Sequence, residues 1–325
     1  MSIKHIGVFT SGGDSPGMNA CIRAVVRASI YNGVRVSGIM KGYEGMIQGD
    51  FRDFTARSVS NIIQRGGTIL KSARSKEFMH ESGRKMAANQ LKEIGIDGLI
   101  AIGGDGTFKG ARVFEQEYGI PVIGVPGTID NDLAGTDFTL GFDTAVNTAV
   151  DAIDKIRDTA ASHDRLFIIE VMGRDAGYIA LYCGSAGGAE SILLPETPTD
   201  IDLIVSGLEA GRKLNKSSNI IVVAEGDEAG GAAEIAELIS KKAGSFDIRV
   251  TILGHIQRGG SPTVNDRLLG TRLGIAAVEA LLEGRSSQMA GIVNDKIVYT
   301  EFSKAVKRDQ LMSKDLLKCN LITSI

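Results

Sequence analysis

Apolar runs that resemble strands alternate with helical patterns along the chain, and this alternation limits the fold more than any other feature. The runs, rich in Val and Ile, cover residues 3–10, 98–102, 121–125, 166–171, 219–224 and 249–256. Several lack a two-residue period, as strands do when both faces of a parallel sheet are covered. Helices must then lie on both faces, and one is expected from about Asp143, its predicted cap. The pattern predicts an α/β fold.

Size and composition narrow the class of protein further. With 325 residues, 43% hydrophobic and 23% charged, the chain suits about two globular domains. A net charge of −3 and the absence of Trp give no general attraction to nucleic acid and no base-stacking platform. Cys21, Cys183 and Cys319 are too few and too widely spaced for a disulfide framework or zinc site. Without a signal-peptide or membrane-span pattern, we expect a cytoplasmic protein.

The first apolar run is followed by a glycine loop and then a helix. Gly12 and Gly13 precede Ser15, which is predicted to cap a helix that begins at Pro16 and ends near Gly33. The amides and dipole at such a helix start attract phosphate. Tight turns between strand and helix also need glycine for geometric reasons, so this loop alone leaves both interpretations open.

A second glycine loop, Gly-Gly-Asp-Gly-Thr at residues 103–107, favours phosphate binding. It also follows an apolar run and opens a helix. Its glycines let backbone amides approach phosphate oxygens closely, while Asp105 has no evident packing or capping task. A carboxylate there suits a Mg²⁺ ion that phosphates also bind. The loop predicts a nucleotide site with Asp105 as metal ligand.

Residues 126–132, Pro-Gly-Thr-Ile-Asp-Asn-Asp, follow the third run and place a hydroxyl and two carboxylates where open parallel sheets bind ligands. Turn formation explains Asp130 or Asp132 singly, but their density with Thr128 favours proton transfer. A kinase needs one carboxylate to accept the proton of the acceptor hydroxyl, and Asp130 is the predicted residue.

Arginines in four short motifs supply the cations that an anionic ligand needs: Arg74, Arg165, Arg174 and Arg258. A guanidinium group donates two hydrogen bonds to phosphate at once, and Arg174 and Arg258 lie beside glycine just past apolar runs. Glu225 ends the run 219–224, where it could bind a sugar hydroxyl or cap a turn, and both alternatives stay open.

Five ordered motifs resemble the bacterial type of ATP-dependent 6-phosphofructokinase, and the resemblance covers most of the chain. They are residues 10–14, 103–107, 126–132, 172–174 and 254–262. The resemblance implies transfer of the γ-phosphoryl group of MgATP to the 1-hydroxyl of fructose 6-phosphate in glycolysis. It also implies two interleaved Rossmann-like domains of three layers with the active site between them. The ATP domain would comprise 1–138 and about 257–304, and the sugar domain about 139–256 and 305–325.

The resemblance also implies residue roles by position. The expected ATP contacts are Gly12, Arg74, Ser75, Gly104, Asp105, Gly106 and Thr107, with Asp105 binding Mg²⁺. The expected sugar-phosphate contacts are Thr128, Asp130, Arg165, Met172, Gly173, Arg174, Glu225, Arg249, His255, Ile256, Gln257 and Arg258. Asp130, Thr128 and Arg174 are the predicted catalytic group. In the family, the equivalents of Arg165 and Arg249 reach the substrate of a neighbouring subunit, so a homotetramer is implied.

The family's allosteric nucleotide site is matched less completely. The matching residues are Arg23, Arg27, Arg157, Gly188 and Glu190. Ser217 and Ser218 stand where relatives have lysines, while Ala56 and Asn61 replace an arginine and an aspartate. This loss of phosphate partners predicts weak or altered activation by ADP and altered inhibition by phosphoenolpyruvate. In the nucleotide region, Lys71 replaces a usual glycine and Ser75 replaces the aromatic residue of some relatives.

Other classes remain as alternatives. Pyrophosphate-dependent phosphofructokinases have Asp at the position of Gly106 and Lys at that of Gly127. A NAD kinase shares the 103–107 element, whereas residues 126–132 and 254–262 fit the sugar kinase. A dinucleotide-binding dehydrogenase needs a glycine spacing that residues 12–17 lack. A non-catalytic nucleotide sensor would have the same fold but would tolerate the loss of Asp130.

Overall fold

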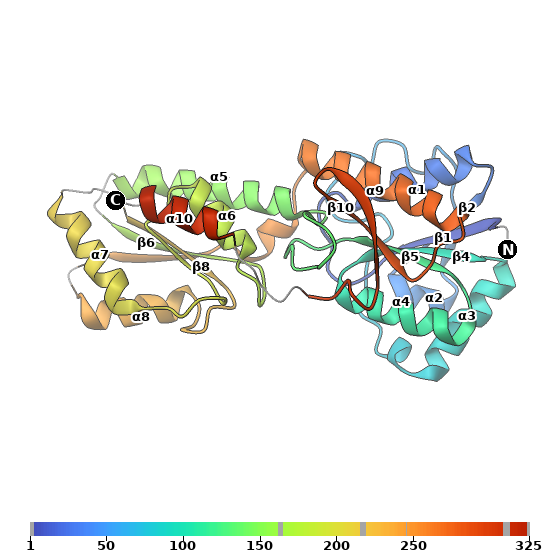
Figure 1. Cartoon of the computed structure of the whole chain (residues 1–325), viewed down its shortest axis with the longest axis horizontal. Helices are drawn as coiled ribbons and strands as arrows, with labels where there is room; N and C mark the ends of the chain where they lie inside the picture. Colours follow the sequence, from blue (N-terminus) through green and yellow to red (C-terminus); the bar gives the residue numbers. More distant parts are fainter. Residues whose placement is uncertain (1–2, 162–164, 215–218, 245, 308–312, 324–325) are drawn as a thin grey trace. The chain divides into compact units, whose positions relative to one another are not determined.

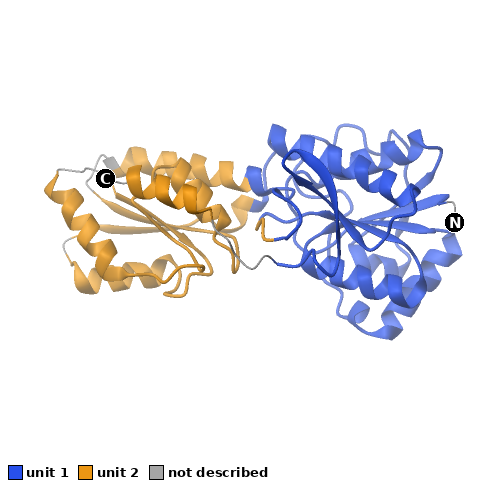
Figure 2. Cartoon of the chain, viewed as in Figure 1, with its two compact units in different colours: residues 1–129, 133–144, 258–308 blue, residues 130–132, 145–257, 309–325 orange. Residues whose placement is uncertain are grey.

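The computed structural model describes residues 3–161, 165–214, 219–244, 246–307 and 313–323. The chain forms two compact units, coloured separately in Figure 2. Unit 1 comprises residues 1–129, 133–144 and 258–308, and unit 2 comprises 130–132, 145–257 and 309–325. The boundaries of the ligand-binding domains stay a prediction.

Unit 1 is built on a mainly parallel sheet of seven strands in the order β11-β10-β5-β4-β1-β2-β3. The strands are β1 (His5–Thr10), β2 (Arg35–Ile39), β3 (Phe51–Asp53), β4 (Gly98–Gly103), β5 (Val122–Pro126), β10 (Gln288–Val293) and β11 (Lys296–Glu301). Only the edge strands β3 and β11 pair antiparallel within this sheet. Every residue of β1 and β4 is buried, which explains why residues 6–9 and 98–103 are apolar without a two-residue period.

Helices cover both faces of this sheet (Figure 1). Helices α1 (Met18–Tyr31) and α9 (Val264–Leu282) pack together on one face, and α2 (Gly42–Gln48), α3 (Glu81–Ile94) and α4 (Asp105–Tyr118) lie on the other. One core contains Val8, Ile22 and Leu273, while the other contains Phe9 and Phe108. The residues of β1 thus alternate between two hydrophobic cores, which gives unit 1 three layers.

Unit 2 has a smaller parallel sheet in the order β7-β8-β6-β9. Its strands are β6 (Leu166–Val171), β7 (Ser191–Leu193), β8 (Asn219–Ala224) and β9 (Ile248–Ile252). Helices α5 (Phe142–Ala161), α6 (Tyr178–Ala186) and α10 (Lys314–Thr323) lie on one face, and α7 (Ile201–Lys213) and α8 (Ala232–Lys242) lie on the other (Figure 1). The two sheets with their helices confirm the predicted α/β class.

Three predicted element boundaries are wrong. The first helix begins at Met18 rather than Pro16, because Gly17 has a left-handed φ of 99°. Helix α5 begins one residue before Asp143, so Asp143 lies in its first turn. The run 249–256 is strand only to Ile252, and Gly254–Arg258 form the short 3-10 helix η2. None of the described helices is long and apolar enough to span a membrane.

Candidate active site

Three loops meet at the carboxyl ends of β1, β4 and β5 in unit 1. The Ser11 amide donates to Ile102 O (3.0 Å), and the Thr107 hydroxyl donates to Ser11 O (3.2 Å). The Gly127 amide donates to Gly103 O (2.9 Å). The structure therefore holds both glycine loops and the start of the 126–132 loop at one edge of the sheet, where open parallel sheets bind ligands.

The loop at residues 103–107 has room for a ligand where a phosphate would approach. Gly104 is the N-cap of α4, and since the Thr107 amide donates to Gly104 O (2.9 Å), the amides of Asp105 and Gly106 are the ones that can meet an anion. A Cβ added at Gly106 would have no atom within 4 Å. The Asp105 Oδ2 atom pairs with Lys109 Nζ at 2.7 Å, while its Oδ1 atom is buried without a hydrogen-bond partner among the described residues. This combination fits a phosphate-bound cation.

The first glycine loop lies against Arg258. Gly12 has a left-handed φ of 88°, and a Cβ added at Gly13 would lie 2.1 Å from Arg258 Nη1. Arg258 Nη1 also donates to Asp14 O at 3.4 Å. The sequence singled out Gly12 as the ligand contact, whereas the structure gives Gly13 a separate task, since a Cβ there would displace the guanidinium group from this position.

An aromatic pair ties the segment of Arg74 and Ser75 to the second glycine loop. Ser75 Oγ accepts from the Phe78 amide at 3.2 Å, at the short 3-10 helix η1 (Glu77–Met79). The Phe78 ring stacks on Tyr43 with centroids 3.9 Å apart, and the Tyr43 hydroxyl donates to Thr107 O at 2.6 Å. Burial raises the pKa of Tyr43, so its hydroxyl remains a donor. Arg74 itself is exposed to solvent.

In unit 2, the loop after β6 is held through its backbone amides. Glu225 Oε1 accepts from the amides of Gly173 (3.2 Å) and Arg174 (2.8 Å). Gln257, which is fully buried, accepts from the Met172 amide at 2.9 Å. Of the two alternatives for Glu225, the structure shows the capping contact, while a sugar contact stays a prediction. His255 and Ile256, beside Gln257, are exposed.

Asp130 also belongs to unit 2 and is only 3% exposed. Its Oδ2 atom lies 3.6 Å from Arg174 Nε, and the Arg174 side chain is 46% exposed. The guanidinium group thus touches the carboxylate and still offers donors to an anion. Arg174 has a left-handed φ of 54°, which the Glu225 contact helps to stabilise. A buried carboxylate beside a cation suits proton acceptance next to a phosphorylated substrate.

Arg165 and Arg249 lie at the other end of the same sheet. Both bind Asp247, at 2.9 Å from Arg165 Nε and 2.6 Å from Arg249 Nη1. Arg165 precedes β6, and the register pairs Arg249 with Phe167, whereas Arg174 follows the carboxyl end of β6. The 6 residues of β6, at about 3.3 Å each, separate Arg165 from the end of the strand that Arg174 follows by roughly 20 Å, and Arg249 lies beside the second of them. The structure does not bring them together within one chain.

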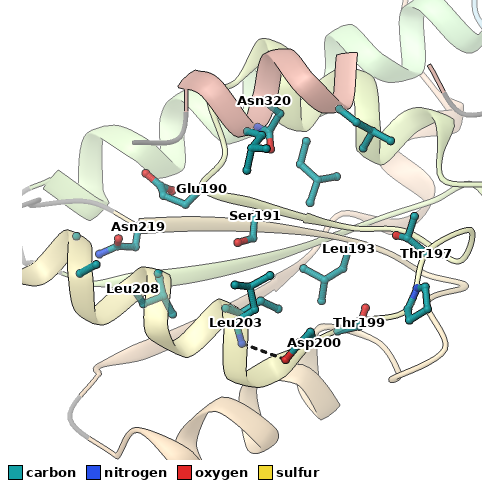
Figure 3. Close-up of a pocket in the computed structure, with 18 of the residues that line it drawn as sticks. Glu190, Ser191, Leu193, Thr197, Thr199, Asp200, Leu203, Leu208, Asn219 and Asn320 are labelled. Carbon is teal, nitrogen blue, oxygen red and sulfur yellow. Dashed lines mark hydrogen bonds between the residues drawn. The ribbon is translucent and has the colours of Figure 1, made fainter. Parts of the chain in front are cut away.

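The predicted allosteric residues are divided between the units. Arg157 Nη2 donates to Gly187 O and Gly188 O, both at 2.6 Å, and Glu190 accepts from the Ile220 amide. Glu190 also lines a pocket of about 800 Å³, walled by apolar side chains of α7, β7 and α10 (Figure 3). Arg23 and Arg27 lie on α1 in unit 1, and Ser217 and Ser218 lie outside the described residues.

Comparison with known proteins gives a consistent result. The family model described as phosphofructokinase matches residues 5–281. The ATP-dependent 6-phosphofructokinase 2 of Bacteroides thetaiotaomicron is 54% identical over 316 residues, covering 97% of each chain. The ATP-dependent 6-phosphofructokinase 1 of Thermus thermophilus is 57% identical over 323 residues, covering 99% of this chain and 100% of that one.

Solved structures agree. Phosphofructokinase from Saccharomyces cerevisiae superposes with a TM-score of 0.89 at 35% identity, over 93% of this chain and 44% of that chain. A pyrophosphate-dependent phosphofructokinase from Marinobacter aquaeolei has a TM-score of 0.85 at 23% identity, over 99% and 92% of the two chains, and shows the fold alone.

Proposed function

The chain belongs to the phosphofructokinase family and phosphorylates fructose 6-phosphate with ATP, and from that premise we propose which residues carry the reaction. The observation that supports the proposal best is the buried carboxylate of Asp130 beside the half-exposed guanidinium group of Arg174. Asp130 accepts the proton of the sugar 1-hydroxyl as the γ-phosphoryl group is transferred in line. The assignment is tested by separating turnover from ligand binding in a variant of Asp130.

ATP is bound by the loops at the carboxyl ends of β1 and β4. The amides at the start of α4 bind phosphate oxygens, and the open side of Gly106 leaves room for them. Arg258, the predicted sugar-phosphate contact, lies directly against the 11–14 loop, where its remaining donors can meet a substrate phosphate beside ATP. Arg74 and Ser75 also contact ATP, and their segment is connected to the second glycine loop through Phe78.

Asp105 would hold Mg²⁺ through its buried Oδ1 atom. Among the described residues, no group of three or more His, Cys, Asp or Glu side chains forms a complete metal site. Phosphate oxygens and water would therefore complete the coordination, as is usual for Mg²⁺ at nucleotide sites. The ion, when bound, would neutralise charge on the β- and γ-phosphates.

The remaining residues position the sugar phosphate and require no covalent intermediate. The loose transition state of phosphoryl transfer asks for alignment and charge neutralisation. Glu225 and Gln257 fix the loop that carries Arg174, and Thr128 lies in the loop that leads to Asp130. Met172, Gly173, His255 and Ile256 complete the proposed contacts in unit 2.

We propose a homotetramer in which Arg165 and Arg249 bind the substrate phosphate of a neighbouring subunit. The argument is geometric, since Arg165 precedes β6 and Arg249 pairs with its second residue, whereas Arg174 follows the opposite end of that strand. Asp247 holds the two guanidinium groups together, and the Arg249 side chain is 49% exposed, so the pair presents donors at the surface.

An Arg249→Ala variant is expected to raise KM for fructose 6-phosphate at least tenfold, since a charged hydrogen bond to phosphate is lost. Reassembling it with an Asp130→Asn variant should restore activity, because mixed oligomers contain some sites with both native residues. Activity is measured after dissociation and reassociation, with Arg272→Ala, an exposed arginine on α9, as control. Mixtures no more active than their separate components would overturn the shared site.

We also propose that ADP is a weak activator at best. Arg157, Gly188 and Glu190 keep the family pattern, whereas Ala56 and Asn61 replace a cationic and an acidic partner. Fewer cations around the effector phosphates lower their affinity. Initial rates at low fructose 6-phosphate should therefore change little as ADP rises through the micromolar range, after correction for product inhibition. Strong activation at those concentrations would refute the proposal.

A further inference from the structure

Two lysines beside the first glycine loop have an unfavourable backbone conformation. Lys41 has a φ of 55° and Lys71 a φ of 59°, in the left-handed region that a residue with a Cβ adopts at a cost in stability. Among the described non-glycine residues with positive φ, half are Asn or Asp, which tolerate this region. The long cationic exceptions are these lysines and Arg174. Since Arg174 belongs to the proposed active site, the same strain at the lysines points to a function.

The backbone of both lysines is fixed around Thr10, the last residue of β1 before the 11–14 loop. The Thr10 hydroxyl donates to Lys71 O at 2.9 Å, and the Lys71 amide donates to Thr68 O at 3.2 Å. The Lys41 amide donates to Leu70 O at 2.8 Å. A Cβ added at Gly42 would lie 2.7 Å from Thr10 O, so the residue that follows Lys41 packs against the end of β1.

The side-chain charges of Lys41 and Lys71 are not neutralised by a carboxylate in the described part of unit 1. Both side chains are exposed, and neither makes an ion pair in the part of the chain that the structure describes. Lys109, by contrast, is engaged with Asp105 beside the second loop. An ammonium group on a flexible four-carbon stem can reach past the backbone that anchors it. Two uncommitted cations therefore lie next to a loop that favours phosphate.

We propose that Lys71, assisted by Lys41, binds the phosphate groups of the nucleoside triphosphate donor. The inference rests on the proposed function and adds a residue to its donor site. Glycine would relieve the backbone strain at position 71 but would supply no charge. The lysine keeps the strain and provides a cation for a polyanion, which strengthens donor binding and leaves the chemical step unchanged.

The Lys71→Gly variant removes the side-chain charge without straining the backbone, so it tests the contribution of the charge alone. The Kd of a non-hydrolysable MgATP analogue, measured by titration calorimetry, and KM for ATP should both rise about fivefold, the size of one partly exposed ion pair. The melting temperature should stay the same or rise, because glycine adopts a positive φ freely. Values of kcat and of KM for fructose 6-phosphate should not change.

Two further variants complete the test. Lys71→Asn tolerates the same backbone without the charge, so its Kd should match that of Lys71→Gly, while Lys85→Ala removes an exposed lysine from α3 and should leave Kd unchanged. Unchanged nucleotide Kd in both Lys71 variants of an active enzyme would overturn the inference. A wild-type protein that binds the analogue but shows no turnover would instead count against the proposed function.

Discussion

An Asp130→Asn variant is expected to lose about 10²–10⁴-fold in kcat while still binding both substrates. The amide keeps the size of the side chain but cannot accept the proton of the sugar hydroxyl. Binding should persist because Arg174 is held independently, through its backbone amide, by Glu225. Initial-rate kinetics give kcat, and titration calorimetry with fructose 6-phosphate and with a non-hydrolysable ATP analogue gives the two affinities.

Asp53→Asn is a suitable control, because Asp53 is an exposed carboxylate on the edge strand β3. It should retain wild-type turnover, which shows that removing one surface charge is harmless. Full activity in the Asp130 variant would contradict the assignment of the proton acceptor. It would also favour the view that this carboxylate only forms the turn of the 126–132 loop.

Gly106→Asp is expected to raise KM for ATP by at least tenfold and to leave fructose 6-phosphate binding unchanged. The open space around a Cβ at this position means that the variant should fold. Its carboxylate would then occupy the ligand side of the loop and repel nucleotide phosphates, at a cost of about 1.4 kcal/mol or more. Gly106→Ala adds a Cβ without charge and should remain close to wild type.

The Ala variant decides between charge and volume. Equal losses in Gly106→Ala and Gly106→Asp would show that space alone matters, and equal losses for both substrates would remove the donor-specific role of this glycine. Gly127, the second position that differs in pyrophosphate-dependent relatives, is closed, since a Cβ there would lie 2.9 Å from Met18 Cε. The open position is therefore the one where substitution tests donor choice without disturbing packing.

The sequence predicts the buried central strands because burial on both faces leaves apolar runs, but it gave no prediction for β2, β3, β7, β10 and β11. Strands β1 and β4, fully buried, lie close to where those runs occur. Helix starts are less predictable, because they depend on single backbone conformations. Because Gly17 has a left-handed φ, the first helix begins two residues later than predicted, and the residues before Gly17 do not indicate this conformation.

The sequence predicted which loops form the candidate site, but it did not predict which side chains contact one another there. Glycine beside strand ends indicates where ligands bind, whereas the partner of each side chain depends on residues far away in the sequence. Gly13 accommodates Arg258, and Glu225 caps the amides of Gly173 and Arg174. Arg165 and Arg174 lie far apart because they flank opposite ends of β6.

The most direct measurement is fructose 1,6-bisphosphate formation by the purified protein with fructose 6-phosphate and Mg²⁺, run in parallel with ATP and with pyrophosphate. We predict turnover with ATP and none with pyrophosphate, since Gly106 leaves the phosphate side of the loop open. Product formed only with pyrophosphate would contradict the donor assignment. No product with either donor would contradict the reaction itself.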